Sequence, residues 1–480
     1  MLTTMIRLAP DSAKSFHRGM KSGTDQTTSR LNRRHFLRNG LAASVTLLAC
    51  PTMPGATPGS GATAPFDIRS LLEANDPKVM KLTQDIFREC VLGKLRPPEG
   101  TLQRQWITAG GGFYGQWIWD TMFVVDLLSM APGMEQNIRE VFQNYWDFQE
   151  RWNKAKPAYA HDMVACMIEP KNTTWLKYPA YSQIPILAWG LERVYLRNHD
   201  RELLKQGLTP LERFHEWYWR ERDVTHSGLI AVGSYSENIQ HGRYETFDNE
   251  CNLDDLKLTP HPVRQGAGEG KWYGNICLPG STGYLISSER SLARLAKVLG
   301  DTAMAERRQR RIAKSVEAVR QHMWDEASGT FLAVKRDTLE KVRVATIGSW
   351  MPLLAGVPTP AMAKRMAETF MTEHWQTPLP IPTVDRKDQR WVPNSYWRGD
   401  VWPAPNYQVA CGFADYGYPQ IAADIADKTI ANALKNGLSE HYDSVTGKPL
   451  GVPNLGMTCT VLTLMLDGLS SQHKLKLKGP

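Results

Sequence analysis

Apolar residues recur at helical spacing through most of the chain, from about residue 66 to residue 470. Across 138–149, aliphatic and aromatic side chains return every three or four positions. The same spacing recurs over 187–195 and 292–299, where Gly300 follows the last apolar residue. This period lines one face of an α-helix with apolar side chains, and a glycine just beyond them is typical of a helix end. Alternating apolar and polar positions are nearly absent, so the pattern predicts an all-α fold.

The predicted helices come in pairs joined by long loops rich in Gly, Pro and aromatic residues. The longest loops cover 153–184, 223–287 and 372–405. Loops of this length within a compact domain are usually functional. We therefore expect residues 66–480 to form one domain, a double ring of about twelve helices with its loops at one end; an open helical solenoid has the same periodicity and stays an alternative. No strand pattern precedes a glycine-rich turn, which argues against a dinucleotide-binding or P-loop fold.

Residues 1–50 have the features of an export signal. Asn32–Arg38 reads NRRHFLR, and a short apolar run follows over Gly40–Ala49. A basic segment, a twin arginine and a brief hydrophobic stretch are typical of twin-arginine signals, and the run is too short to span a bilayer stably. A basic amphipathic helix at the start of the fold is the alternative. Leu47–Cys50 resembles a lipobox, which predicts either a lipid on Cys50 or ordinary cleavage nearby.

Residues 51–65 are rich in Pro, Gly, Ala and Thr, and we expect them to form a disordered tether. The leader and tether together predict a protein that uses the twin-arginine export machinery. Its place of action is then the periplasm or another extracytoplasmic site, with membrane anchoring if Cys50 carries a lipid.

The excess of positive charge lies in the leader. The whole chain has 57 Lys and Arg against 49 Asp and Glu, a net charge of +8. Residues 1–50 hold eight of the basic and two of the acidic side chains, so the rest carries 49 basic and 47 acidic ones. A groove that follows nucleic-acid phosphates needs a basic surplus in the folded part, so we expect no nucleic-acid partner.

Two further residue types bear on function. The seven cysteines are scattered, with no CxxC and no Cys/His cluster at zinc spacing, so no metal or other cofactor is predicted. The sixteen tryptophans exceed the usual number. Most are expected in the core, but indole faces also stack on sugar rings, which mildly favours a carbohydrate site.

Four loop motifs carry a resemblance to known enzymes. They are Gly115–Asp120 (GQWIWD), Tyr181–Ile186 (YSQIPI), Tyr396–Pro403 (YWRGDVWP) with Asn406-Tyr407, and Ser439–Asp443 (SEHYD) with Thr446-Gly447. In this order and spacing they resemble glycoside hydrolase family 63, in particular its bacterial mannosylglycerate and glucosylglycerate hydrolase branch, and more distantly the trehalases. The resemblance covers most of residues 100–468. It implies an (α/α)6 barrel with a sugar-binding site in its long loops.

Inverting glycoside hydrolysis needs one protonated carboxyl to protonate the leaving oxygen and one carboxylate to activate water. In the resembling family the acid is the Asp of a loop motif that here reads YETFDNE, residues 244–250, which implies Asp248. The base implied by the resemblance is Glu440. The alternative for Asp248 is to cap a helix or to bind a loop amide. The alternative for Glu440 is a solvated residue at a helix end. Because the loop departs from the family pattern at 244–246, Glu245 and Glu250 are competing candidates for the acid.

The resemblance also implies a set of substrate-binding residues. Trp119 and Asp120 would form the floor of the sugar site, Gln183 would bind a hydroxyl, and Arg398 would offer a fork of donors. The alternatives are a core position and a helix cap for the first two, a loop-bracing amide for Gln183 and a salt bridge within the loop for Arg398. The last four members of the set are Tyr396, Trp397, Trp402 and Asn406. All four would line the pocket, but Asn406 has merely holding the loop as its alternative.

Two departures from the family pattern concern specificity. Asp400 stands where the family usually has Pro, and it would either alter the specificity or accept a hydrogen bond within the loop. Leu455–Thr458 reads LGMT where Phe-Ser-Trp-Thr is typical, so one aromatic wall is expected to be missing. The sequence thus predicts an exported, inverting, exo-acting α-glycosidase that cleaves a small glycoside or an oligosaccharide end. A carbohydrate-binding protein that lost hydrolysis and a polysaccharide lyase on a similar scaffold remain the alternatives.

Overall fold

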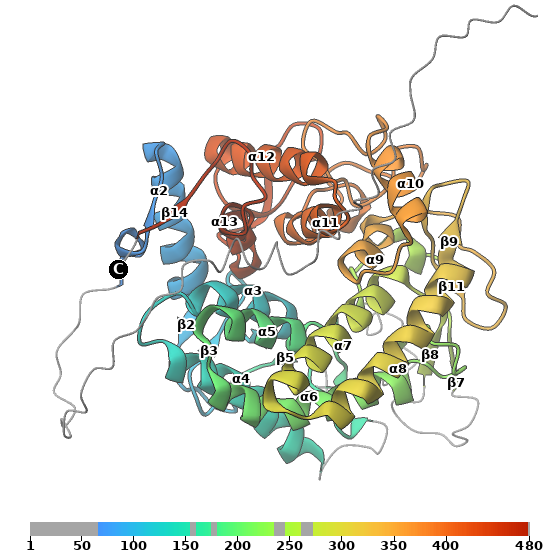
Figure 1. Cartoon of the computed structure of the whole chain (residues 1–480), viewed down its shortest axis with the longest axis horizontal. Helices are drawn as coiled ribbons and strands as arrows, with labels where there is room; N and C mark the ends of the chain where they lie inside the picture. The colour runs from blue at the N-terminus through green and yellow to red at the C-terminus, as the bar shows by residue number, and fades with distance from the viewer. Residues whose placement is uncertain (1–65, 154–159, 174–179, 235–244, 261–271, 479–480) are drawn as a thin grey trace, which may run out of the picture.

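The computed structural model describes residues 66–153, 160–173, 180–234, 245–260 and 272–478 (Figure 1). The export signal, the tether and Cys50, together with Tyr244 of the acid loop, lie outside these described residues. Within them, no helix is long and apolar enough to cross a membrane. The six cysteines of the described part are free thiols, and all but Cys411 are buried.

The described residues are mainly helical, as the hydrophobic period predicts. Proline opens several helices, among them Pro279, Pro403 and Pro419, where its missing N–H costs nothing, and the Asp200 carboxylate caps the start of α6. The twelve α-helices of the described part are α2 (Pro77–Asp85), α3 (Ile118–Leu128), α4 (Glu135–Asn153), α5 (Leu187–Asn198), α6 (Arg201–Glu221), α7 (Pro279–Leu299), α8 (Thr302–Ala318), α9 (Met351–Leu354), α10 (Pro360–Phe370), α11 (Pro403–Asp415), α12 (Pro419–Asn436) and α13 (Thr460–Leu466).

The odd-numbered helices pack against one another in succession. Helix α3 contacts α5, and the contacts continue through α7, α9 and α11 to α13. The circuit closes because the 3-10 segment η11 (Gly456–Cys459), which leads into α13, packs against α3. In Figure 1 the even-numbered helices α4, α6, α8, α10 and α12 lie outside this ring. All eleven residues of α3 are buried, as expected for a helix surrounded by neighbours.

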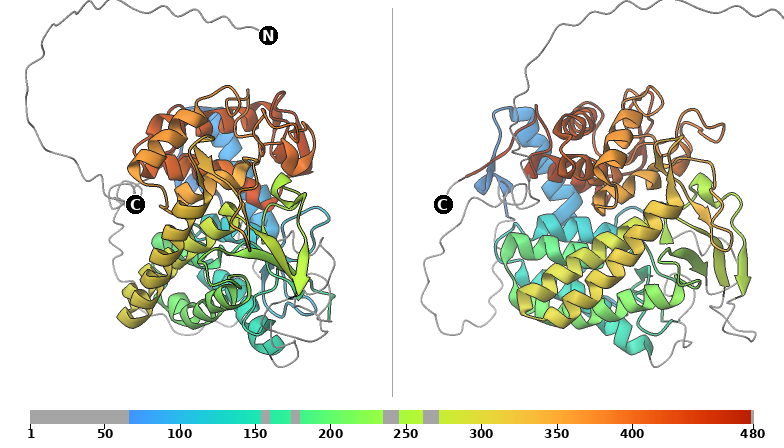
Figure 2. Two further views of the ribbon diagram at one scale, coloured as in Figure 1. Left: turned by 90° about the vertical axis from the view of Figure 1, so that its right-hand side faces the viewer. Right: turned by 45° about the vertical axis from the view of Figure 1, so that its right-hand side comes forward.

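The loops contain short antiparallel strands. The sequence pattern did not predict these strands. The largest sheet joins β6, β7 and β11 to β8, with Ala231 opposite Cys277 and Lys335 opposite Ile276, and it lies at the edge of the helices (Figure 2). Strands of two to six residues are too short to produce a readable alternation. The strands are β1 (Leu72–Glu73), β2 (Leu95–Arg96), β3 (Trp106–Ile107), β4 (Gln116–Trp117), β5 (Met167–Ile168), β6 (Ala231–Ser234), β7 (Leu258–Pro260), β8 (Trp272–Cys277), β9 (Trp324–Asp325), β10 (Thr330–Phe331), β11 (Val334–Lys335), β12 (Ser439–Tyr442), β13 (Pro449–Pro453) and β14 (Lys476–Leu477).

Candidate active site

A cavity lies where several odd-numbered helices begin. Trp119 and Asp120 open α3, Gln183 precedes α5, Trp402 precedes α11 and Met457 lies in η11 before α13. The sequence motifs meet here because each occupies the loop before one of these helices. The lining residues are Ala109, Phe113, Trp117, Trp119, Asp120, Gln183, Thr246, Asp248, Tyr396, Trp397, Trp402, Glu440, Leu455 and Met457.

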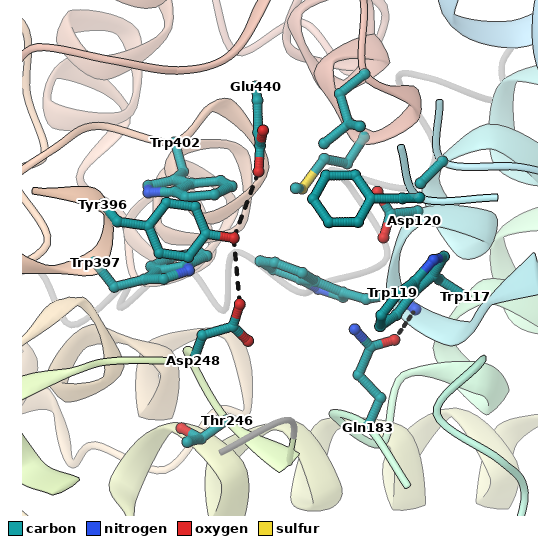
Figure 3. Close-up of a pocket in the computed structure, with 14 residues that line it drawn as sticks. Trp117, Trp119, Asp120, Gln183, Thr246, Asp248, Tyr396, Trp397, Trp402 and Glu440 are labelled. Atoms are coloured by element: carbon teal, nitrogen blue, oxygen red, sulfur yellow. Dashed lines mark hydrogen bonds between the residues drawn. The ribbon is translucent and has the colours of Figure 1, made fainter. Parts of the chain in front are cut away.

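Asp248 and Glu440 lie on either side of one phenol in this cavity (Figure 3). The Tyr396 hydroxyl oxygen is 3.2 Å from Asp248 Oδ2 and 3.5 Å from Glu440 Oε1. A phenol has one proton, so it donates to one carboxylate at a time and can accept from the other carboxyl when that group is protonated. The arrangement therefore suits a pair in which one member carries a proton and the other does not.

Glu440 is held at the cavity by the hairpin of β12 and β13. Its Oε2 accepts a 2.9 Å hydrogen bond from the Val452 amide. Gly451, at φ +70°, lets the backbone approach, since a Cβ there would lie 2.5 Å from that oxygen. Burial raises the pKa of Glu440, while the Val452 amide, the neighbouring His441 and the Tyr396 hydroxyl act in the opposite direction.

Glu245, one competing candidate for the acid, is engaged elsewhere. Both of its oxygens lie 2.5 Å from guanidinium nitrogens of Arg222, and the Gly233 amide donates to Oε2 at 3.1 Å. Both members of the ion pair are buried, and Glu245 is not among the cavity residues. This ion pair anchors the start of the acid loop three residues before Asp248.

Glu250, the other candidate, anchors the end of the same loop. It accepts hydrogen bonds from Asn252 Nδ2 at 2.9 Å, from Thr346 Oγ1 at 3.0 Å and from the Thr246 hydroxyl. Burial raises its pKa, but its side chain does not line the cavity. Of the three acidic residues of the loop, the structure brings only Asp248 to the cavity.

Asp120 adds a third carboxyl to the cavity and faces Asp248 and Tyr396 from the opposite side (Figure 3). Its Oδ1 is buried and has no hydrogen-bond partner among the described residues. Burial, followed by the nearby charges of Glu440 and Asp248, raises the pKa of Asp120 to about 7. A buried acceptor without a partner is suited to binding a ligand donor, such as a sugar hydroxyl.

Gln183 and Trp119 are positioned by each other. The Trp119 backbone N–H donates to Gln183 Oε1 at 2.9 Å, which fixes the orientation of the amide and leaves its NH₂ group as the remaining donor. The Trp119 ring contacts the rings of Trp397 and Phe247 at centroid distances of 5.9 Å. Gln183 is thus both the loop-bracing amide and a cavity residue.

Stacked rings form the wall behind Tyr396. Trp397 and Trp402 stack at 4.0 Å, and Trp402 stacks in turn on His441 at 4.7 Å. Asp400 is fully buried beneath them, where its Oδ2 accepts the Tyr396 backbone N–H at 2.8 Å and lies 2.9 Å from His441 Nδ1. Tyr396 has a left-handed backbone, with φ +59°, a strained state that persists only where such contacts fix it. Asp400 is accordingly a loop acceptor, outside the cavity lining.

The structure does not bring Arg398 or Asn406 to the cavity lining. The Arg398 guanidinium pairs with both oxygens of Asp254 and donates to the Asn249 carbonyl at 2.6 Å, so it ties the tryptophan-rich loop to the acid loop. Asn406 is buried and bonds the Pro380 carbonyl at 2.8 Å and the Thr429 hydroxyl at 3.0 Å. Asn406 thus holds its loop, which was its alternative role, whereas the Arg398 salt bridge joins two loops and is not the one expected within its own loop.

Six cavity residues are absent from the expected set. Trp117 lies inside the first motif, Thr246 in the acid loop, and Leu455 and Met457 in the segment that departs from the family pattern, so each was signalled by its position. Ala109 and Phe113 carry no chemistry that sequence reasoning could have singled out. In the part of the chain that the structure describes, no three His, Cys, Asp or Glu side chains gather as a metal site requires.

Three carboxyl groups, those of Asp120, Asp248 and Glu440, face one cavity with indole walls at the starts of helices packed in a circuit. The chain belongs to the family described as the mannosylglycerate hydrolase MGH1-like glycoside hydrolase domain, whose model matches residues 113–458.

Relatives with described functions agree with this assignment. Mannosylglycerate hydrolase MGH1 of Selaginella moellendorffii is 23% identical over 412 residues, covering 72% of this chain and 78% of its own. The mannosylglycerate hydrolase of Thermus thermophilus is 33% identical over 131 residues, 27% of this chain. That match spans 31% of the Thermus protein, and a match to the Rubrobacter radiotolerans enzyme spans 42% of that protein, so the chain matches well under two thirds of either.

Solved structures share the fold. A GH63 mannosylglycerate hydrolase from Thermus thermophilus in complex with glucose superposes with a TM-score of 0.62 at 21% identity, covering 81% of this chain and 99% of that one. Neutral trehalase Nth1 from Saccharomyces cerevisiae superposes with a TM-score of 0.53 at 14% identity, covering 76% and 73% of the two chains.

Proposed function

We propose that the protein is an inverting, exo-acting α-glycosidase on an (α/α)6 barrel, and that it hydrolyses a small glycoside or an oligosaccharide end. The closed circuit of odd-numbered helices and the likeness to the Thermus enzyme support the barrel. The mixture of carboxyl, amide and aromatic side chains that line the cavity suits a single sugar ring.

In this proposal Asp248 protonates the glycosidic oxygen and Glu440 removes a proton from the attacking water. The observation that carries it is the single hydroxyl of Tyr396 lying between the two carboxyls. The two hydroxyl distances keep Asp248 Oδ2 and Glu440 Oε1 within about 6.7 Å of each other, so both carboxyls can reach the same glycosidic bond. The inverting outcome is the expectation from the family resemblance, and the anomer released decides it. A raised pKa in a partly enclosed site is also what an acid/base carboxyl needs, and Glu440 has one.

Substrate positioning falls to the remaining polar and aromatic lining. Trp119 offers a flat ring for a sugar, and the stacked Trp397 and Trp402 line the cavity beside it. Asp120 accepts and Gln183 donates hydrogen bonds to hydroxyls. Holding the ring against both carboxyls can supply several kcal/mol of the barrier reduction.

The test is a hydrolysis screen of p-nitrophenyl α-glucoside and α-mannoside, trehalose and the two glycosylglycerates. For any substrate that is cleaved, proton NMR during the first turnovers identifies the anomer released. The proposal expects the β-anomer from an α-glycoside and loss of turnover in Asp248→Asn and Glu440→Gln. Sugar binding without turnover, unchanged in both variants, supports the non-catalytic carbohydrate-binding alternative. Unsaturated products formed from a polysaccharide, detected by their ultraviolet absorbance, support a lyase.

The leader gives this proposal a location outside the cytoplasm. Its support is the twin arginine at Arg33-Arg34, the short apolar run and the tether, all of them sequence features. Cell fractionation tests it: the unaltered chain is expected outside the cytoplasm and the Arg33→Lys/Arg34→Lys variant inside. Equal distribution of both contradicts the export proposal. Detergent-dependent extraction that Cys50→Ala abolishes identifies a lipid anchor.

A further inference from the structure

Four of the residues that line the cavity have apolar side chains without oxygen or nitrogen. Ala109, Phe113, Leu455 and Met457, named here the apolar wall, come from two segments far apart in the sequence. The Gly456 N–H donates to the Ala109 carbonyl at 2.7 Å and holds the segments together. A Cβ at Gly456 would lie 3.2 Å from the Val124 side chain, so the fit at this junction is close.

The backbone carbonyls of the apolar wall are also engaged within the protein. The Ala109 carbonyl accepts from Gly456, the Phe113 carbonyl from the Gly115 amide and the Thr108 hydroxyl at 3.0 Å each, and the Leu455 carbonyl from the Thr458 amide at 3.0 Å. The Met457 carbonyl accepts the Thr460 hydroxyl at 2.9 Å. The side chains offer no hydrogen bond to a ligand hydroxyl, and each of these carbonyls already accepts a hydrogen bond within the protein.

The apolar wall stands beside the proposed base. The Thr458 hydroxyl donates to the Ser439 carbonyl at 3.0 Å, which ties η11 to the strand that carries Glu440. In an inverting reaction the base activates water on the face of the sugar opposite the leaving group. A wall on the base side therefore contacts the sugar that is cleaved off, the glycone, and not the leaving group.

We propose that the glycone lacks a hydroxyl where it faces the apolar wall, so that the substrate is a glycoside of a deoxysugar. A hydroxyl there would lose its water and gain no side-chain hydrogen bond from the apolar wall, whereas a methyl or methylene group would gain contacts. The remaining hydroxyls face Asp120, Gln183 and the carboxyl pair. This inference rests on the proposed function and adds a substrate class to it.

The experiment compares p-nitrophenyl α-D-mannoside and α-D-glucoside with their monodeoxy analogues, one hydroxyl removed at a time. At least one analogue is expected to exceed its parent in kcat/KM by about 10- to 100-fold, the discrimination that an apolar surface gives against a buried hydroxyl. If every deoxy analogue is hydrolysed no faster than its parent, the apolar wall meets only C–H groups of an ordinary ring, and the inference is wrong.

Variants at Met457 separate the wall from other causes. Met457→Gln supplies an amide for a hydroxyl and should reduce the preference for the deoxy analogue at least tenfold, whereas Met457→Leu keeps the surface apolar and should retain the preference. Met371→Gln makes the same chemical change at a residue that is 58% exposed and should alter nothing. A preference that survives Met457→Gln contradicts the inference.

Failure of the proposed function gives a different result. If neither parent nor analogue is hydrolysed, the proposed glycosidase is wrong, and titration calorimetry with the free monosaccharides then tests the apolar wall alone. Tighter binding of a deoxysugar than of its parent, lost in Met457→Gln, supports the wall as a specificity element. Equal affinity, or no binding of either sugar, counts against it.

Discussion

Replacing Glu245 with Gln should destabilise the protein strongly, because it leaves Arg222 as a buried cation without its counter-charge. The two side chains are 2% and 3% exposed, and the guanidinium approaches both carboxylate oxygens at 2.5 Å. Removing one partner of a buried ion pair costs about 3–5 kcal/mol. For a folded part of roughly 400 residues, whose unfolding entropy is about 0.8 kcal/mol per kelvin, this lowers Tm by about 4–6 °C.

Thermal unfolding followed by circular dichroism measures the effect. Glu340→Gln is the matched control, because its partner Lys335 and Glu340 itself are 47% and 65% exposed and a surface pair of this kind is worth at most about 1 kcal/mol. Arg222→Met/Glu245→Leu should recover most of the lost stability, since the penalty arises from an uncompensated charge. A Glu245→Gln protein that unfolds at the temperature of the unaltered one would refute the structural role, and would return Glu245 to the candidates for the acid.

Three further predictions concern the cavity and its supports. Asp120→Asn should be more stable than the unaltered protein at pH 8 and equally stable below about pH 4. The pKa of Asp120 is raised from 3.8 to about 7, so the stability of the unaltered protein falls as the pH rises between these two pKa values. Tm measured from pH 4 to 8 for both proteins decides this. Tyr396→Phe should move the acidic limb of kcat/KM to higher pH, because the lost hydroxyl no longer lowers the pKa of Glu440; an unmoved limb in the pH–rate profile contradicts the contact. Asn406→Ala should cost about 1–3 kcal/mol of stability through its lost buried hydrogen bonds while KM stays the same, and a raised KM at full stability would make it a substrate residue after all.

The helices were predictable from the sequence because their signal is local. A 3.6-residue period, proline at the start and glycine at the end are all readable within one segment, as α7 and Gly300 show. The sheet around β8 was not, because its strands join residues such as Ala231 and Cys277 that are distant in the sequence, and each strand is too short to show a period. Pairing of this kind depends on the completed fold.

The residues of the site also fall into those that the sequence predicts and those that depend on the completed fold. Asp248, Glu440, Trp119 and Asp120 were found through motifs, and the structure brings them to one cavity. The role of Arg398 could not be read from its motif, because it depends on Asp254, 144 residues away. Polar and aromatic residues in a motif indicate a site. Whether each one faces the substrate or braces the loop depends on its neighbours in the folded structure.

Only half of the apolar wall could be predicted from the sequence. The departure at Leu455–Thr458 predicts a changed wall, and Met457 indeed lines the cavity. Its other half, Ala109 and Phe113, consists of residues that are ordinary in any core, so no residue type marks them. Their importance follows from the Gly456 hydrogen bond to Ala109 that brings the two segments together.

The division of roles between Asp248 and Glu440 is the central claim, and the leaving group tests it most directly. An α-glycosyl fluoride needs little protonation as its bond breaks, whereas an alkyl glycoside of the same sugar does. Asp248→Asn should therefore lose about 10²–10⁴-fold in kcat on the alkyl glycoside and keep most of its rate on the fluoride, while Glu440→Gln should lose both. Rapid fluoride hydrolysis by Glu440→Gln, or equal loss on the two substrates in Asp248→Asn, would contradict the account.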